Sequence, residues 1–176
     1  MKVSAYMAAS IDGYIARENG EIDWLIEGEN REEDYGYAEF IATVSCLIIG
    51  RNTFEKILSF PEWPYGNKRV IVLSRTIKQL PSAIINKAEL CGGDLLNLVE
   101  RLSSEGEERL YIDGGMIIQS FLKLGLVTDI TITRIPILLG KGIPLFGFLD
   151  SDIKINHVAT NVFDNGFVQS KYLLNA

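Results

Sequence analysis

The sequence predicts an α/β protein whose sheet is parallel at its centre and antiparallel at its C-terminal edge. Three apolar, strand-like runs end directly before glycine, serine or aspartate and pass into polar or helix-forming residues. Beyond Leu126 the pattern changes to strand-like segments with no helix long enough to separate them. Alternation of strand and helix favours parallel pairing, whereas consecutive strands favour antiparallel pairing. The chain of 176 residues shows no linker or repeat, which predicts a single domain over residues 1–176.

The first half of the chain is expected to supply most of the parallel strands. An apolar run at 2–9 predicts a buried strand, followed by a turn at Gly13 and a loop that holds Trp24. From about Glu32 to Val44, apolar residues recur at helical spacing and predict a helix. We then expect a strand at 46–49, a short helix near 52–59, a strand at 69–73 and another strand around 84–90.

The second half begins with a helix that Asp94 can cap, because a carboxylate accepts hydrogen bonds from the first free N–H groups of a helix. A strand at 109–112 and a helix at 115–123 complete the alternation. The antiparallel strands are expected at 127–134, 153–163 and 167–174, with a hairpin turn at Asp164-Asn165-Gly166.

Composition excludes several classes of protein. The formal net charge of −6 disfavours nucleic-acid binding, which needs a basic surface. The apolar run near the N-terminus is broken at Asp12, so it is too short for a signal peptide, and no segment reaches membrane-spanning length. We therefore expect a cytoplasmic protein with no nucleic-acid or membrane partner. Cys46 and Cys91 lack C-x-x-C spacing and His157 is the only histidine, so no metal site is predicted.

The three strand ends are suited to a phosphorylated ligand. They are Leu47-Ile48-Ile49-Gly50-Arg51-Asn52-Thr53, Val70-Ile71-Val72-Leu73-Ser74-Arg75-Thr76 and Leu110-Tyr111-Ile112-Asp113-Gly114-Gly115. An open α/β sheet binds its ligand at the carboxyl ends of its strands, where helix N-termini offer free N–H groups and the positive end of their dipoles. The sequence therefore predicts a nucleotide site.

Individual side chains at these junctions support that prediction. Arg51 supplies a planar donor fork suited to phosphate, although a surface salt bridge with Glu55 would also explain it. Thr53 can cap the helix while its hydroxyl faces a pyrophosphate. Gly114-Gly115 lets the backbone approach a pyrophosphate closely and starts a helix. A carboxylate beside a phosphate is repulsive, so we expect Asp113 to turn away and cap that helix.

In their order and spacing the segments resemble the dihydrofolate reductase superfamily. The resemblance is closer to one branch of it, which is related to the pyrimidine reductase domain of an enzyme of bacterial riboflavin biosynthesis. That enzyme is a bifunctional deaminase/reductase, and the reductase is its C-terminal domain. The matching segments span nearly the whole chain and are Met7 to Ala16, Asp23-Trp24-Leu25, Gly50 to Glu55, Leu73 to Thr76, Asp113-Gly114-Gly115 and Leu139 to Phe146. The resemblance implies a three-layer fold like that of dihydrofolate reductase, with a twisted, mostly parallel eight-stranded sheet, and NADPH as cofactor.

The resemblance also implies which residues contact NADPH. The backbone of Ala8 and Ile15 would hold the nicotinamide carboxamide, and Arg75 would lie beside the adenosine ribose. A second basic residue there favours a 2′-phosphate, hence NADPH over NADH, although a solvated loop arginine is the alternative. The remaining cofactor residues implied are Gly50, Arg51, Asn52, Thr53, Leu73, Ser74, Asp113, Gly114, Gly115, Met116 and Ile117.

Hydride transfer to a C=N or C=O bond requires a proton donor at the developing charge. An ungapped count back from Gly50 places Asp34 where dihydrofolate reductases carry their catalytic carboxylate, and Thr133 matches its hydroxyl partner. An acidic helix start is also ordinary dipole complementation, and one insertion would bring Glu33 or Glu32 to this position instead.

Three functions follow from these expectations. The first is an NADPH-dependent reductase of a small heterocyclic, pterin- or pyrimidine-like substrate. The second is 5-amino-6-(5-phosphoribosylamino)uracil reductase, whose substrate phosphate Lys141 or Arg134 could meet. The third is a non-catalytic dinucleotide-binding module, if Asp34 is a surface cap. The C-terminal edge and the apolar 135–148 segment predict a homodimer, although a folded-back loop would explain that segment equally well.

Overall fold

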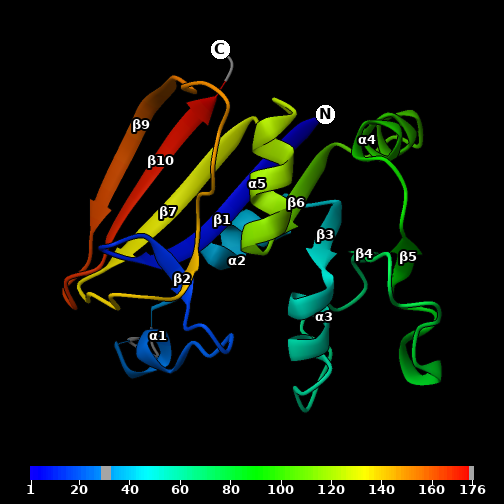
Figure 1. Ribbon diagram of the computed structural model, residues 1–176, viewed down its shortest axis with the longest axis horizontal. Coiled ribbons are helices and arrows are strands. Elements are labelled where there is room, and N and C mark those ends of the chain that lie inside the picture. The colour runs from blue at the N-terminus through cyan, green and yellow to red at the C-terminus, as the bar shows by residue number, and fades with distance from the viewer. Residues whose placement is uncertain (29–32, 175–176) are drawn as a thin grey trace.

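A computed structural model describes residues 1–28 and 33–174. Its centre is an eight-stranded sheet in the order β5-β4-β3-β6-β1-β7-β10-β9 (Figure 1). The strands are β1 (Lys2–Ser10), β3 (Cys46–Gly50), β4 (Arg69–Leu73), β5 (Glu89–Cys91), β6 (Arg109–Asp113), β7 (Asp129–Ile135), β9 (Ile155–Val162) and β10 (Val168–Leu174). Pairing is parallel from β5 to β7 and antiparallel from β7 through β10 to β9. The predicted eight-stranded sheet with its antiparallel C-terminal edge is confirmed.

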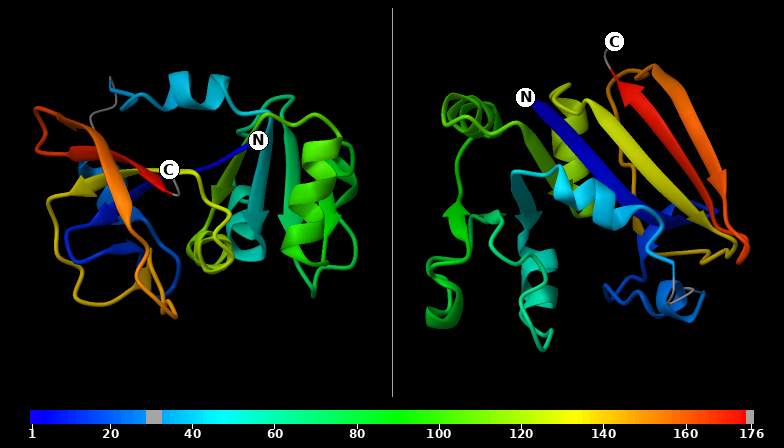
Figure 2. Two further views of the ribbon diagram at one scale, coloured as in Figure 1. Left: turned by 90° about the horizontal axis from the view of Figure 1, so that it is seen from above. Right: turned by 180° about the vertical axis from the view of Figure 1, so that it is seen from behind.

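Helices cover both faces of the sheet and complete three layers. They are α1 (Asp23–Gly28), α2 (Tyr37–Ala42), α3 (Arg51–Ile57), α4 (Leu95–Ser104) and α5 (Gly115–Lys123), with a short 3-10 helix, η1 (Ser82–Ile84). Figure 2 shows α2 and α5 on opposite sides of the sheet. Buried side chains of α4 and α5 pack in one cluster, and those of α3 pack in another together with partly buried side chains of α2.

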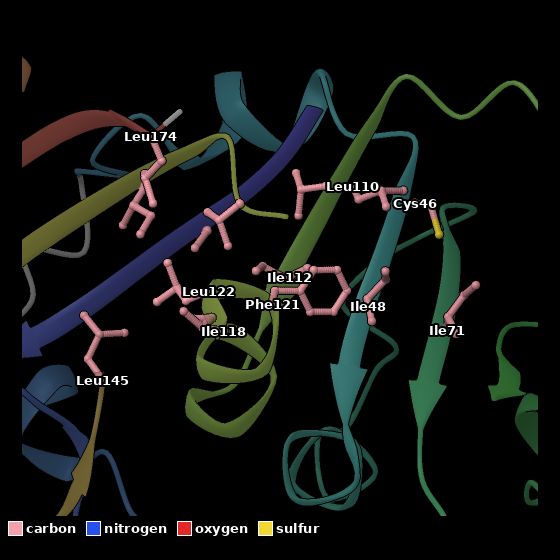
Figure 3. Packing of buried hydrophobic residues seen from close by; sticks show 14 of the residues in the cluster. Cys46, Ile48, Ile71, Leu110, Ile112, Ile118, Phe121, Leu122, Leu145 and Leu174 are labelled. Carbon is pink, nitrogen blue, oxygen red and sulfur yellow. The ribbon is translucent and has the colours of Figure 1, made fainter. Parts of the chain in front are cut away.

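Strands β3 and β4 are apolar along most of their length because both of their faces are buried. In β3, Cys46 and Ile48 point into the cluster under α5, while Leu47 and Ile49 point into the cluster under α3. Figure 3 shows Ile48 and its neighbours packed around Phe121 of α5. These two layers of apolar contacts hold the carboxyl ends of the central strands in register.

Local signals set several element boundaries correctly. The carboxylate of Asp94 caps α4 by accepting hydrogen bonds from the backbone N–H groups of Leu96 (2.9 Å) and Asn97 (3.1 Å). The helix at 115–123 has the predicted bounds, and the hairpin between β9 and β10 turns at Asp164–Gly166 with Gly166 at φ 82°.

Other predictions for single elements are wrong. Trp24 lies in α1 and not in a loop. The helix expected from Glu32 to Val44 is only α2, because Gly36 directly before it adopts a left-handed conformation with φ 83°; Glu32 itself lies outside the described residues. The strand expected at 84–90 is divided between η1 and β5.

A small second sheet was not predicted. It pairs β2 (Tyr14–Ala16) with β8 (Ile143–Pro144), so the segment after β7 folds back onto the segment after β1. Leu145 is fully buried there, whereas Leu138 remains 71% exposed. The folded-back alternative therefore accounts for part of the apolar 135–148 segment. Among the helices of the described ranges, none has the length and apolar character needed to cross a membrane.

Candidate cofactor site

The strand-to-helix junctions meet at the carboxyl edge of the sheet because the strands that precede them are parallel neighbours. Ile49 of β3 lies opposite Asp113 of β6, and Gly50 lies opposite Leu73 of β4. The helices α3 and α5 begin at this edge, so their free N–H groups face the same side of the molecule. The prediction that these junctions form one site is consistent with this placement.

The first and third junctions are in direct contact. A Cβ atom built on Gly114 would lie 2.9 Å from the Oγ1 of Thr53, and one built on Gly50 would lie 3.2 Å from the Cγ1 of Ile117. Gly114 also has φ +100°, a conformation that other residues rarely adopt. Thr53 does not cap α3 as expected, because Gly50 holds the N-cap position without a side-chain bond. Its hydroxyl faces the glycine pair instead.

Gly115 has a different steric role from the one expected. A Cβ atom there would lie 3.0 Å from the Cδ1 of Ile15 and 3.0 Å from the backbone oxygen of Pro144. The expectation was that a Cβ would collide with the pyrophosphate, but protein atoms already occupy that direction. Gly115 therefore lets β2 and β8 pack directly on the start of α5.

The basic residues at this edge are exposed and available to a ligand. In the described part of the chain, neither Arg51 nor Arg75 forms an ion pair. The salt bridge between Arg51 and Glu55 that would have explained Arg51 is therefore not formed. Asn52 is also exposed, and Met116 is 76% exposed at the start of α5. Ser74 differs, because its hydroxyl accepts hydrogen bonds from the backbone N–H groups of Thr76 and Ile77 and closes a local turn.

Asp34 does not lie in the environment predicted for a catalytic acid. Its carboxylate is exposed and accepts hydrogen bonds from the N–H groups of Gly36 and Ala38, both at 2.9 Å, at the start of α2. These bonds stabilise the charged form and lower the pKa of Asp34, whereas proton donation near neutral pH requires a raised pKa. The cause is the backbone: Tyr35 and Gly36 have φ values of 54° and 83°, which turn the carboxylate back onto its own chain.

Thr133 is buried and lies opposite Ala8 across the β1–β7 pair. Its hydroxyl accepts a hydrogen bond from the Nε2 of Gln169 at 3.0 Å, so the expected bond from Asp34 to Thr133 is replaced by this one. Ala8 itself packs beside the buried Trp24. Trp24 is therefore a core residue.

Asp113 is a partly buried carboxyl group at the end of β6. It shares a face of β6 with Tyr111, and burial raises its pKa to about 6 although it accepts a hydrogen bond from the N–H of Gly114. It does not cap α5 as expected, because Gly114 is the N-cap and no side chain makes the capping bond. Burial, followed by the nearby charge of Asp113, also raises the pKa of Tyr37 to about 12.

The model of the RibD C-terminal domain family matches residues 1–169. The chain belongs to this family. A relative, the uncharacterized protein YwjB of Bacillus subtilis (strain 168), is 35% identical over 178 aligned residues, covering 98% of this chain and 97% of that protein. The crystal structure of a putative riboflavin biosynthesis protein from Shewanella sp. PV-4 is 40% identical, covers both chains completely and has a TM-score of 0.95.

The fold extends beyond the RibD C-terminal domain family. Dihydrofolate reductase from Enterococcus faecalis, solved in complex with NADP(H) and RAB-propyl, has a TM-score of 0.67 with 17% identity, and the match covers 99% of this chain and 97% of that one. The predicted dihydrofolate reductase-like fold and the branch within the superfamily are confirmed.

This member of the RibD C-terminal domain family has a polar network that the sequence did not reveal. Gln169 is buried and donates from Nε2 to Tyr6, to the backbone oxygen of Tyr35 and to Thr133. The network links β10, β1 and β7 to the segment before α2. Gln169 begins a run of three polar residues, Gln169-Ser170-Lys171, so its sequence pattern is that of an exposed edge residue.

A groove of about 340 Å³ runs along α2 and is separate from the junctions. Its walls include Phe40 of α2, Asn161 of β9 and Lys171 of β10, and it reaches Gln169. None of the residues predicted to contact NADPH lines it.

Proposed function

We propose that the protein is an NADPH-dependent reductase that transfers a hydride to a C=N or C=O bond of a small heterocyclic substrate. The observation that carries this proposal is the convergence of the α3 and α5 N-termini with an exposed, unpaired Arg51 at the carboxyl edge of a RibD C-terminal domain. Helix N-termini and a free guanidinium provide the donors and the positive charge that a dinucleotide phosphate requires.

The residues at this edge fit NADPH. The N–H groups at the start of α3 and α5 would bind the pyrophosphate, and Arg51 and Arg75 would bind the 2′-phosphate. The backbone of Ala8 and Ile15 would hold the nicotinamide carboxamide. Bound NADPH supplies the hydride. The relationship to a dihydrofolate reductase solved with NADP(H) supports the choice of cofactor.

Asp113 is our candidate for the proton donor. Hydride addition leaves negative charge on nitrogen or oxygen, and a donor with a pKa near neutrality serves it best. The pKa of Asp113, raised to about 6 by burial, leaves a fraction of its carboxyl protonated near neutral pH. Asp34 is exposed and ionised, so we do not assign the proton transfer to it.

Two other functions have support from particular observations. The family match and the Shewanella protein support 5-amino-6-(5-phosphoribosylamino)uracil reductase. The suggested phosphate contacts already have protein partners, since Lys141 pairs with Glu18 at 2.9 Å and Arg134 donates to the backbone oxygen of Ser10 at 3.0 Å. The surface position of Asp34 is the feature that a non-catalytic dinucleotide-binding module would show.

Cofactor binding is the first experiment. Fluorescence titration should give a lower dissociation constant for NADPH than for NADH, and Arg51→Ala and Arg75→Ala should each weaken NADPH binding by about one to two decades, the worth of a charge-assisted phosphate contact. Lys56→Ala, an exposed cation in the last turn of α3, is the matched control and should bind as the wild type does. Equal affinity of the wild type for the two cofactors would remove the basis for the assignment.

Substrate screening then separates the three functions. Dihydropterins, deaminated pyrimidines and small carbonyl compounds should be tested for NADPH oxidation, with and without a phosphoribosyl group. Turnover of the phosphoribosyl pyrimidine alone favours the riboflavin-pathway reductase. NADPH binding without turnover of any candidate favours the binding module.

We also propose that the protein acts in the cytoplasm as a homodimer. The support for dimerisation is the edge strand β9, all eight residues of which are exposed. An edge strand with apolar side chains is a common site of strand pairing between copies.

A further inference from the structure

Two chain segments at the carboxyl edge are joined into one unit, which we call the clasp: residues 10–18 after β1 and residues 137–145 after β7. The two strands are parallel neighbours, with Ser10 opposite Ile135, so both segments leave the sheet side by side. The clasp contains the β2–β8 sheet that the sequence did not predict.

Backbone bonds run along the clasp at both ends. The N–H of Ile11 donates to the oxygen of Ile137 at 3.0 Å, and the N–H of Leu145 donates to the oxygen of Gly13 at 2.9 Å. At the exposed tip, the Nζ of Lys141 lies 2.9 Å from Glu18.

Asp12 is the side chain that joins the two segments. Its Oδ2 accepts a hydrogen bond from the N–H of Gly140 at 2.7 Å, and its Oδ1 accepts one from the N–H of Leu139 at 3.2 Å. Its Oδ1 also accepts a 2.6 Å bond from the hydroxyl of the fully buried Ser10, and that hydroxyl accepts the N–H of Tyr14 at 2.9 Å. One carboxylate therefore connects the end of β1, the start of β2 and the turn at 139–140.

Both halves of the clasp pack against Gly115, the first residue of α5. A Cβ atom on Gly115 would lie 3.0 Å from Ile15, which belongs to the first half, and 3.0 Å from the oxygen of Pro144, which belongs to the second. If the two halves separate, the residues that pack against the start of α5 therefore move. The backbone of Ile15, which would hold the nicotinamide, moves with them.

We propose that Asp12 is a positioning residue, which holds the clasp closed and thereby fixes Ile15 and the start of α5 in the geometry that binds the nicotinamide end of NADPH. The proposal rests on the proposed function. Asp12 itself does not touch the cofactor and acts through the backbone that it holds.

The test compares Asp12→Asn with Asp94→Asn. Asp94 caps α4 by accepting two backbone N–H groups, the same chemistry as Asp12, on a helix that none of the predicted cofactor residues belongs to. An asparagine offers one acceptor where the carboxylate offers two and places an NH2 group against a backbone donor, so both variants lose stability. We expect Asp12→Asn, unlike Asp94→Asn, to raise the NADPH dissociation constant by about tenfold, which corresponds to about 1.4 kcal/mol of lost positioning.

Hydrogen exchange supplies a readout that does not depend on the cofactor. In the ligand-free protein, Asp12→Asn should accelerate exchange at the amides of Leu139 and Gly140, whereas Asp94→Asn should not. Ser10→Ala removes the hydroxyl that Asp12 accepts from and tests the same connection if Asp12→Asn fails to fold; we expect it to weaken NADPH binding too.

The outcomes separate this proposal from the proposed function. If the wild type binds NADPH and Asp12→Asn, or Ser10→Ala in its place, binds it equally well, Asp12 is only a structural tie and the proposal is overturned. If the wild type does not bind NADPH, the proposed function fails, and positioning by Asp12 fails with it even where exchange confirms the clasp.

Discussion

At the scale of single residues, the two carboxylates that we considered for proton transfer lie in opposite environments. Asp34 has its charge stabilised by two backbone N–H groups, and Asp113 has its charge destabilised by burial. Sequence spacing selected Asp34 because a count along the chain cannot show that Tyr35 and Gly36 turn the carboxylate outward. The signal for Asp113 in the sequence is an acidic residue that ends an apolar strand directly before Gly-Gly.

The first residue-scale prediction concerns Asp113 and pH. Its pKa is about 6 in the folded protein against an ordinary 3.8, so between these values the folded state binds more protons than the unfolded state, and stability falls as pH rises through that window. Asp113→Asn removes this dependence. The variant should be more stable than the wild type near pH 7 by on the order of 3 kcal/mol, and the difference should vanish below about pH 4. Urea unfolding across that range measures it.

Asp34→Asn is the control with the opposite sign. The pKa of Asp34 is lowered in the folded state, so its charge stabilises the protein above the ordinary pKa and that contribution is lost as pH falls through the folded pKa. The variant should be less stable than the wild type near neutral pH and approach the stability of the wild type in acid.

For Asp113, a loss of stability in Asp113→Asn that is equal at every pH would show that burial does not destabilise the Asp113 carboxylate.

At the scale of elements, the strand-to-helix junctions were predictable because their signals are local. Each combines an apolar run with glycine, serine or a capping residue within a few positions. The clasp was not predictable, because β2 and β8 are only three and two residues long and are stabilised by a partner more than 120 residues away. The shortness of α2 depends likewise on the conformation of Gly36, which propensity does not reveal.

The glycine at the start of α5 gives an element-scale prediction. A Cβ on Gly115 meets the backbone oxygen of Pro144 at 3.0 Å, so Gly115→Ala must displace β8 or α5. We expect a loss of stability of about 1–3 kcal/mol, typical of overpacking, together with weaker NADPH binding. Thermal unfolding and cofactor titration measure the two effects.

Gly93→Ala is the matched control, because a Cβ there has no neighbour within 4 Å and the residue lacks a positive φ. It should leave stability within about 0.5 kcal/mol or raise it slightly. A Gly115→Ala variant that is as stable as Gly93→Ala but fails to bind NADPH would contradict this explanation. It would show that the added Cβ collides with bound NADPH and not with β8.

At the scale of the whole molecule, the sheet passes from a fully covered centre to an uncovered edge. The central parallel strands are covered by helices on both faces, whereas β9 has one strand partner and eight exposed residues (Figure 1). The sequence predicted the change from parallel to antiparallel pairing at about Leu126, whereas the structure has it after β7, which still pairs in parallel with β1. It could not identify what covers the outer edge, because an alternating strand has the same pattern whether solvent or a second copy lies beside it.

The proposed homodimer gives the whole-molecule prediction, and the chain offers a matched pair of substitutions for it. Val162 on β9 is 73% exposed and Leu138 in the folded-back segment is 71% exposed, and each belongs to one of the two regions from which a dimer was predicted. A lysine on an edge strand opposes pairing with another strand, because its charge would be buried between the two copies. Light scattering after size exclusion should therefore find a dimer for the wild type and for Leu138→Lys, and a monomer for Val162→Lys. The reverse result would move the interface to the 137–145 segment, and a monomeric wild type would contradict the dimer itself.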